Sequence, residues 1–200
     1  MVSAFNSYNP FMDNFVVTFA PKRSSAASGR SMVPKNYPNS AFATDTTTYD
    51  VSKPEALRRA TEDPRLEKLT GGTGWSVNQK SFINDIPYAR KGTSALLSAI
   101  CKQTGLRIVV TSALGTGSGP HQKKNESWSH QNACNPKLDI RVVDQNKLNA
   151  TGLFARINGE GDHLDIMFKP EVYSDLEKGM SVDEVMKKYK GQKGQLTGRF

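Results

Sequence analysis

Two histidines in this chain lie near carboxylates and beside apolar, strand-like runs. His130 and Asp139 fall in the segment "SHQNACNPKLDI", and His163 follows Glu160 in "GEGDHLDIMF". A catalytic zinc ion takes three protein ligands and keeps one position for water, and a carboxylate beside that water acts as the general base. We therefore predict a zinc site with His130, Asp139 and His163 as ligands. Glu160 is the predicted base.

The alternation of residue types explains how two of these side chains would meet. Asp139 lies between Leu138 and Ile140, and a similar apolar alternation follows His163. Successive side chains of a strand point to opposite faces of the sheet, and neighbouring strands lie about 4.8 Å apart. If the two strands are adjacent, Asp139 and His163 share an open polar face above a core.

Simpler interpretations compete at the two motifs. His130 and His163 could be ordinary hydrogen-bonded histidines. Cys134 competes with Asp139 as a zinc ligand, but Pro136 disfavours a helix that would hold Cys134 beside His130, so we rank Asp139 first. A Cys134–His130 nucleophile pair has no other support in the sequence.

The neighbouring polar residues also carry alternatives. Asp165 could be a ligand, a hydrogen-bond partner of His163 or a solvated strand residue, and we prefer the last. Asp162 is interpreted as a turn residue. His121 and Trp128, in the long loop before the first motif, are the candidates for substrate contact, and plain exposure is the alternative for His121.

The pattern of elements divides the chain into four parts. Residues 1–51 are rich in Ser, Thr, Pro, Gly and Asn without periodicity, which predicts an extended arm that cannot fold alone. Its scattered aromatics would hold it on another protein or on its own domain. Residues 52–87 are expected to form a short helix and a linker, 88–190 the folded domain and 191–200 a basic tail.

Within these parts, local signals predict the individual elements. Ser52 and Glu55 match a capping box for the first helix, and the glycine-rich 69–79 indicates a linker. Further on we expect a helix over 93–105, strands over 106–112 and 137–143, a hairpin turning at 158–161 and a last helix capped by Ser181 and Glu184. This order predicts an α+β fold, with a small, mostly antiparallel sheet flanked by helices.

The composition restricts the partners. The net charge of +8 favours polyanions, and the basic stretch over 187–199 allows nucleic acid, although no nucleic-acid-binding motif is present. There is no apolar run long enough for a membrane span. The start lacks a basic-then-apolar pattern, so we expect no secretion signal, and two cysteines do not make a disulfide framework. Synthesis in a reducing cytoplasm fits best.

Both motifs resemble those of the zinc D-alanyl-D-alanine carboxypeptidase superfamily, which includes phage L-alanyl-D-glutamate endopeptidases and shares a fold with the hedgehog signalling domain. "SHQNACNPKLDIRV" is similar to the pattern S-x-H-x-x-G-x-A-x-D, and "EGDHLDIMF" to E-x-x-H. The resemblance spans roughly residues 88–170. It implies Zn²⁺ bound by His130, Asp139 and His163, and peptidoglycan stem peptides as substrate.

Departures from the family pattern leave two functions open. The separation of His130 and Asp139 is longer than in that pattern, and a stretch with Cys134 and Pro136 replaces its Gly and Ala. One interpretation is a virion-associated peptidase of a bacteriophage, made in the host cytoplasm, whose arm contacts other virion proteins. The other is a structural virion protein that keeps the domain without its catalysis.

Overall fold

The structure, a computed structural model, describes residues 47, 49–82, 85–115 and 137–199. These residues all belong to one structural unit, which spans 37–200. The expected arm up to residue 46 lies outside the described residues. The same holds for the loop that contains His121, Trp128 and His130.

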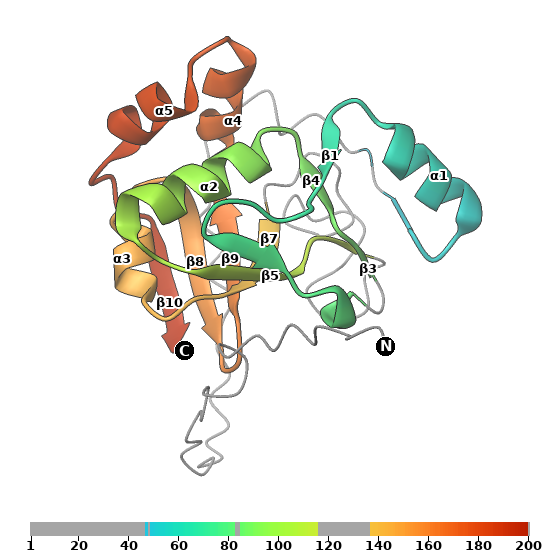
Figure 1. The fold of residues 1–200 in the computed structure, drawn as a ribbon, viewed down its shortest axis with the longest axis horizontal. Helices are drawn as coiled ribbons and strands as arrows, with labels where there is room; N and C mark the ends of the chain where they lie inside the picture. Colours follow the sequence, from blue (N-terminus) through green and yellow to red (C-terminus); the bar gives the residue numbers. More distant parts are fainter. Residues whose placement is uncertain (1–46, 48, 83–84, 116–136, 200) are drawn as a thin grey trace, which may run out of the picture. The chain divides into compact units, whose positions relative to one another are not determined.

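A six-stranded sheet forms the centre of the described part (Figure 1). Its order is β10-β8-β9-β7-β5-β2, in which the inner strands pair antiparallel and the two edge strands pair parallel with their neighbours. The strands are β2 (Trp75–Val77), β5 (Ile108–Ser112), β7 (Lys137–Arg141), β8 (Phe154–Glu160), β9 (Leu164–Phe168) and β10 (Gln195–Arg199). The prediction of an α+β fold with a mostly antiparallel sheet is confirmed.

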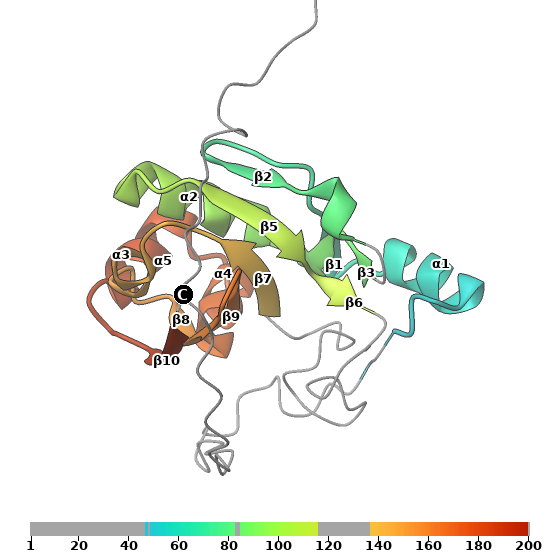
Figure 2. The same cartoon turned by 90° about the horizontal axis from the view of Figure 1, so that it is seen from below.

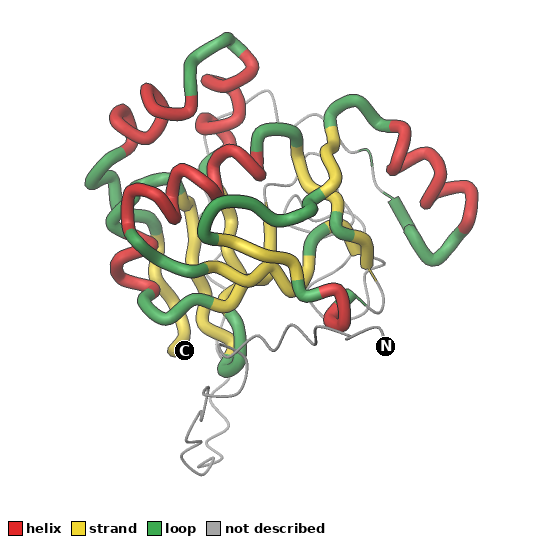
Figure 3. Tube along the Cα trace, in the orientation of Figure 1, coloured by secondary structure: helices red, strands yellow, loops and turns green. Residues whose placement is uncertain are grey.

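Helices pack against this sheet. They are α2 (Thr93–Thr104), α3 (Gln145–Asn149), α4 (Pro170–Glu177) and α5 (Val182–Tyr189). Figure 2 shows α2, α3 and α5 on the same side of the sheet, and Figure 3 marks the helices in red and the strands in yellow. Among the described residues, no helix has both the length and the apolar character that crossing a membrane requires.

A smaller part of the fold precedes and flanks the sheet. It holds α1 (Pro54–Glu62), a 3-10 turn (Gln79–Ser81) and the strands β1 (Leu66–Lys68), β3 (Asp85–Ile86), β4 (Tyr88–Arg90) and β6 (Leu114–Gly115). These strands form two antiparallel pairs, β1 with β4 and β3 with β6. A second small apolar cluster that includes Tyr49, Ala60 and Leu66 stabilises this part.

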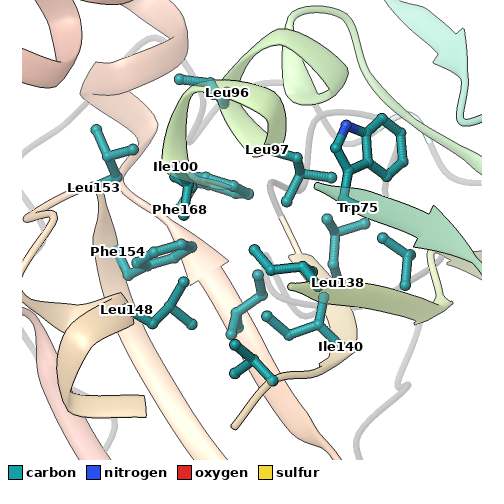
Figure 4. Packing of buried hydrophobic residues seen from close by; sticks show 14 of the residues in the cluster. Trp75, Leu96, Leu97, Ile100, Leu138, Ile140, Leu148, Leu153, Phe154 and Phe168 are labelled. Carbon is teal, nitrogen blue, oxygen red and sulfur yellow. The ribbon is translucent and has the colours of Figure 1, made fainter. Parts of the chain in front are cut away.

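The main core lies between α2 and the sheet. Leu97 and Ile100 point from α2 toward Leu138 and Phe168 of the strands (Figure 4). All four side chains are buried. Because alternate residues of β7 and β9 are apolar, the core uses one face of the sheet and leaves the polar residues on the other.

Local signals correctly predict where two helices end or begin. Gly105 ends α2 in the left-handed conformation, with a φ of 70°, which glycine adopts without a steric penalty. Ser181 and Glu184 form the complete capping box of α5. The predicted capping box at Ser52 is wrong, because α1 begins at Pro54 after Lys53. The Ser52 hydroxyl donates to Asp50 Oδ1 instead, at 2.5 Å.

Part of the expected linker over 69–79 forms the edge strand β2, which corrects the interpretation based on its glycines. Trp75 is buried and its Nε1 donates to Ser98 Oγ at 2.9 Å. Gly74 is required by packing, since a Cβ there would lie 2.5 Å from the Cβ of Cys101. Gly74 therefore allows close contact between this segment and α2.

Much of the expected basic tail forms β10, which corrects a second interpretation. Gly194 and Asn149 exchange two hydrogen bonds, of 3.0 and 3.3 Å, at the start of this strand. A Cβ at Gly194 would lie 2.0 Å from the carbonyl oxygen of Phe154. Glycine therefore permits the close approach that lets β10 pair with β8.

The contact between Gly152 and the end of α5 gives a stability test. Gly152 has a φ of 80°, and a Cβ would lie 1.7 Å from the Tyr189 carbonyl oxygen. Gly179 has a similar φ of 91°, but no described residue has a heavy atom within 4 Å of its Cβ position. Gly152→Ala is expected to lower the free energy of unfolding by about 1–3 kcal/mol more than Gly179→Ala, because only the former adds overpacking. Urea denaturation of both variants measures this, and equal losses would contradict the packing.

Candidate functional site

Three of the predicted site residues meet on the polar face of the sheet. β7 and β9 are adjacent and antiparallel, with Asp139 opposite Asp165. His163 immediately precedes β9, and its Nε2 lies 3.8 Å from Asp139 Oδ2 and 3.4 Å from Glu160 Oε2. The three side chains are each between 20% and 29% exposed. They form a partly buried polar cluster that solvent can reach.

The other predicted site residues belong to a segment outside the described part of the chain. His130, the third predicted ligand, lies outside the described residues, as do His121 and Trp128. The competing ligand Cys134 lies outside them too. The structure therefore positions two predicted ligands and the predicted base.

The hairpin between β8 and β9 positions Glu160 beside His163. The Glu160 N–H donates to the His163 carbonyl oxygen at 3.0 Å, and Gly161 turns the chain with a φ of 95°. The hairpin was predicted, but β8 continues through Glu160, so the turn lies at 161–163 rather than at 158–161. This shift places the Glu160 carboxylate at the end of β8.

His163 has carboxylates on both sides of its ring. Its Nδ1 lies 2.7 Å from Asp162 Oδ1, while Nε2 faces Asp139 and Glu160. Burial lowers the pKa of His163, but the hydrogen bond to Asp162 and the three negative charges outweigh burial, and the pKa is raised above 6.5. The bond from His163 in turn lowers the pKa of Asp162. The cluster therefore favours a positive charge at the imidazole.

A hydrogen-bonded relay holds Glu160. Asn158 Nδ2 donates to Glu160 Oε1 at 2.9 Å, and Thr197 Oγ1 donates to Asn158 Oδ1 at 2.8 Å. One oxygen of Glu160 is thus fixed while the other faces His163. The relay connects β10 through β8 to the cluster.

Asp165 is buried, and our preferred interpretation of it as a solvated residue is wrong. It is 3% exposed, and its Oδ2 accepts a hydrogen bond from Arg156 Nη2 at 2.7 Å and forms an ion pair with Lys137 Nζ at 3.0 Å. Two strands that flank β9 provide these cations, so the environment of Asp165 depends on sheet order. The Asp165 carboxylate therefore pairs with Lys137 and Arg156 rather than with His163.

Sequence reasoning missed several residues that hold the cluster in place. Asn158 alternates with Glu160 along β8, so strand periodicity could have placed both on one face. Thr197 gave no such signal, because its segment was expected to be a tail. Asp162 was identified only as a turn residue, yet it bonds to His163. Arg141 in turn contacts Asp162.

The donor atoms of Asp139 and His163 are of the kind that zinc binds. Two ligands of a tetrahedral zinc ion lie about 3.3 Å apart, given bonds of about 2.0–2.1 Å, and the two atoms are 3.8 Å apart here. No three His, Cys, Asp or Glu side chains in the described part of the chain form a complete metal-binding group. Two predicted ligands thus lie close together, and the predicted third, His130, lies outside the described residues.

Comparisons of this chain with protein-family models, curated protein sequences and solved structures found no match. An assignment of its function therefore depends on the side chains of the site and on their geometry. Fold class by itself does not assign a function.

The charges around His163 give a pH prediction for the metal-free protein. The pKa of His163 by NMR is expected to lie above 6.5, and Glu160→Gln is expected to lower it by removing a negative charge. Since the pKa is raised by folding, His163 contributes stability below its unfolded pKa and loses this contribution as the pH rises through the folded pKa. Asp183→Asn on α5 is the control. A wild-type pKa at or below 6.5 contradicts the arrangement.

The buried ion pair gives a second prediction. Asp165→Ala leaves the Lys137 ammonium buried, at 4% side-chain exposure, without its carboxylate. The variant is expected to lower the free energy of unfolding by about 3–5 kcal/mol. Lys137→Met combined with Asp165→Ala is expected to recover part of this loss, because no buried ammonium then remains. Urea denaturation measures both, and a loss no greater in the single than in the double variant would contradict the ion pair.

Proposed function

We propose that this protein is a zinc-dependent peptidase that acts on peptidoglycan stem peptides and is associated with a bacteriophage virion. The observation that carries the proposal is the meeting of Asp139, Glu160 and His163 on the polar face of the sheet. These are the two ligands and the base that the E-x-x-H motif and its upstream aspartate imply. They come from three different strands or strand ends, so their meeting is a result of the fold.

The electrostatics of the cluster support a cation there. Two carboxylate oxygens lie 3.4 and 3.8 Å from Nε2 of His163. The charge of Asp165 is balanced by Lys137 and Arg156 within the sheet. Asp139 and Glu160 place negative charge near Nε2 of His163, and a proton or a metal ion would balance that charge.

Each residue has a role in the proposed reaction. Asp139 and His163 would hold a zinc ion together with His130, which the first motif implies. A zinc ion held there would polarise the substrate carbonyl and make water a stronger nucleophile at neutral pH. Glu160 accepts the proton of the attacking water through Oε2 and delivers it to the leaving amine. Asn158 keeps Glu160 oriented by holding Oε1.

The sequence supports peptidoglycan peptides as the proposed substrate and the virion as the proposed location. The two motifs resemble those of enzymes that cut peptidoglycan peptides, and the net charge of +8 would favour approach to an anionic cell wall. The composition of the N-terminal arm suits contact with other virion proteins. These points support the proposed virion-associated role.

Metal analysis and peptidoglycan digestion of the full chain test the proposal. The wild type is expected to bind one zinc ion and to release peptides from purified muropeptides. His163→Ala and Asp139→Ala are expected to lose zinc. Glu160→Gln is expected to keep zinc and to lose about 10²- to 10⁴-fold in cleavage rate, the usual contribution of a general base. Asp183→Asn is the control that keeps both properties.

The contrary outcomes separate the alternatives. Absence of zinc in the wild type would overturn the proposal. Zinc without cleavage of any muropeptide would favour the structural virion protein. Cleavage that survives Glu160→Gln would remove Glu160 as the base.

A further inference from the structure

The two ring nitrogens of His163 face competing carboxylates. Nδ1 lies 2.7 Å from Asp162 Oδ1, and Nε2 lies 3.4 Å from Glu160 Oε2. A neutral imidazole carries one N–H, which donates, while its other nitrogen offers a lone pair. The carboxylate that accepts this N–H therefore decides which nitrogen can bind a metal ion.

Asp162 is itself held from the neighbouring strand. Arg141 at the end of β7 donates from Nε to the Asp162 carbonyl oxygen at 3.1 Å and from Nη2 to its Oδ2 at 3.3 Å. The two contacts leave Oδ1 of Asp162 directed at the imidazole. Arg141 thus anchors the turn of the hairpin against β7.

We infer that Asp162, held by Arg141, is a positioning residue that fixes the His163 tautomer with its proton on Nδ1. The lone pair of Nε2 then faces Asp139 and Glu160. The use of that lone pair for zinc rests on the proposed function, but the tautomer is a property of the metal-free protein. The two can therefore be tested separately.

The distances favour this tautomer over the alternative. A hydrogen bond from an imidazole N–H to a carboxylate is charge-assisted and strongest near the 2.7 Å seen at Asp162. At 3.4 Å, Glu160 is the weaker acceptor. Without Asp162, the proton would move to Nε2 and form a hydrogen bond with Glu160. Nε2 would then carry a proton and have no lone pair for a metal ion.

Two-bond ¹⁵N–¹H NMR correlations of the metal-free full chain read the tautomer directly, at a pH where the ring is neutral. His163→Gln assigns the signals. The wild type is expected to carry the proton on Nδ1, because Asp162 Oδ1 accepts it. Asp162→Ala is expected to carry it on Nε2. Asp183→Ala, which removes a distant exposed carboxylate, is expected to match the wild type.

Zinc titration of the same proteins tests the consequence. Asp162→Ala is expected to bind zinc about 10- to 100-fold more weakly than wild type, the usual effect of removing a partner of a metal-bound histidine. A wild-type proton on Nε2, or an unchanged tautomer in Asp162→Ala, would overturn the inference. A changed tautomer with unchanged zinc affinity would overturn its consequence for zinc binding. The expected tautomers without zinc binding in any protein would support the tautomer assignment and overturn the proposed function.

Discussion

Antiparallel pairing of β7 with β9, in the register that sets Asp139 opposite Asp165, is the constraint on which the rest of the described structure depends. In this register Leu138 and Ile166 lie opposite each other and are buried. A slip of one residue would turn every apolar side chain of a strand to the other face. The burial of the apolar face therefore fixes the position of the polar cluster, because the same alternation controls both.

The acidic residues of the polar face serve two different purposes. Asp165 is buried and bound by two cations from flanking strands, so it joins three strands and stabilises the sheet. Asp139 and Glu160 remain partly exposed and face the same imidazole nitrogen. Burial with a cationic partner separates the first kind of carboxylate from the second. The second kind is the one that faces the imidazole of His163.

The edge strand β10 connects the end of the described chain to the cluster. Thr197 reaches Glu160 through Asn158, so the orientation of the carboxylate depends on the pairing of β10 with β8. That pairing requires the close approach at Gly194. On the other side, Arg141 and Asp162 hold the imidazole. The geometry of the cluster thus comes from contacts between strands, while each strand alone positions only its own side chains.

The sequence by itself determined what depends on a few neighbouring residues. Alternation predicted the central strands, and the glycine after α2 and the capping box of α5 predicted helix ends. Only the tertiary structure decided that 75–77 and 195–199 are edge strands, because their partners lie far along the chain. It also decided that Asp165 is buried while Asp139 is not, since burial depends on which strands become neighbours. Local sequence encodes side-chain alternation and helix caps, whereas strand order results from packing the whole core.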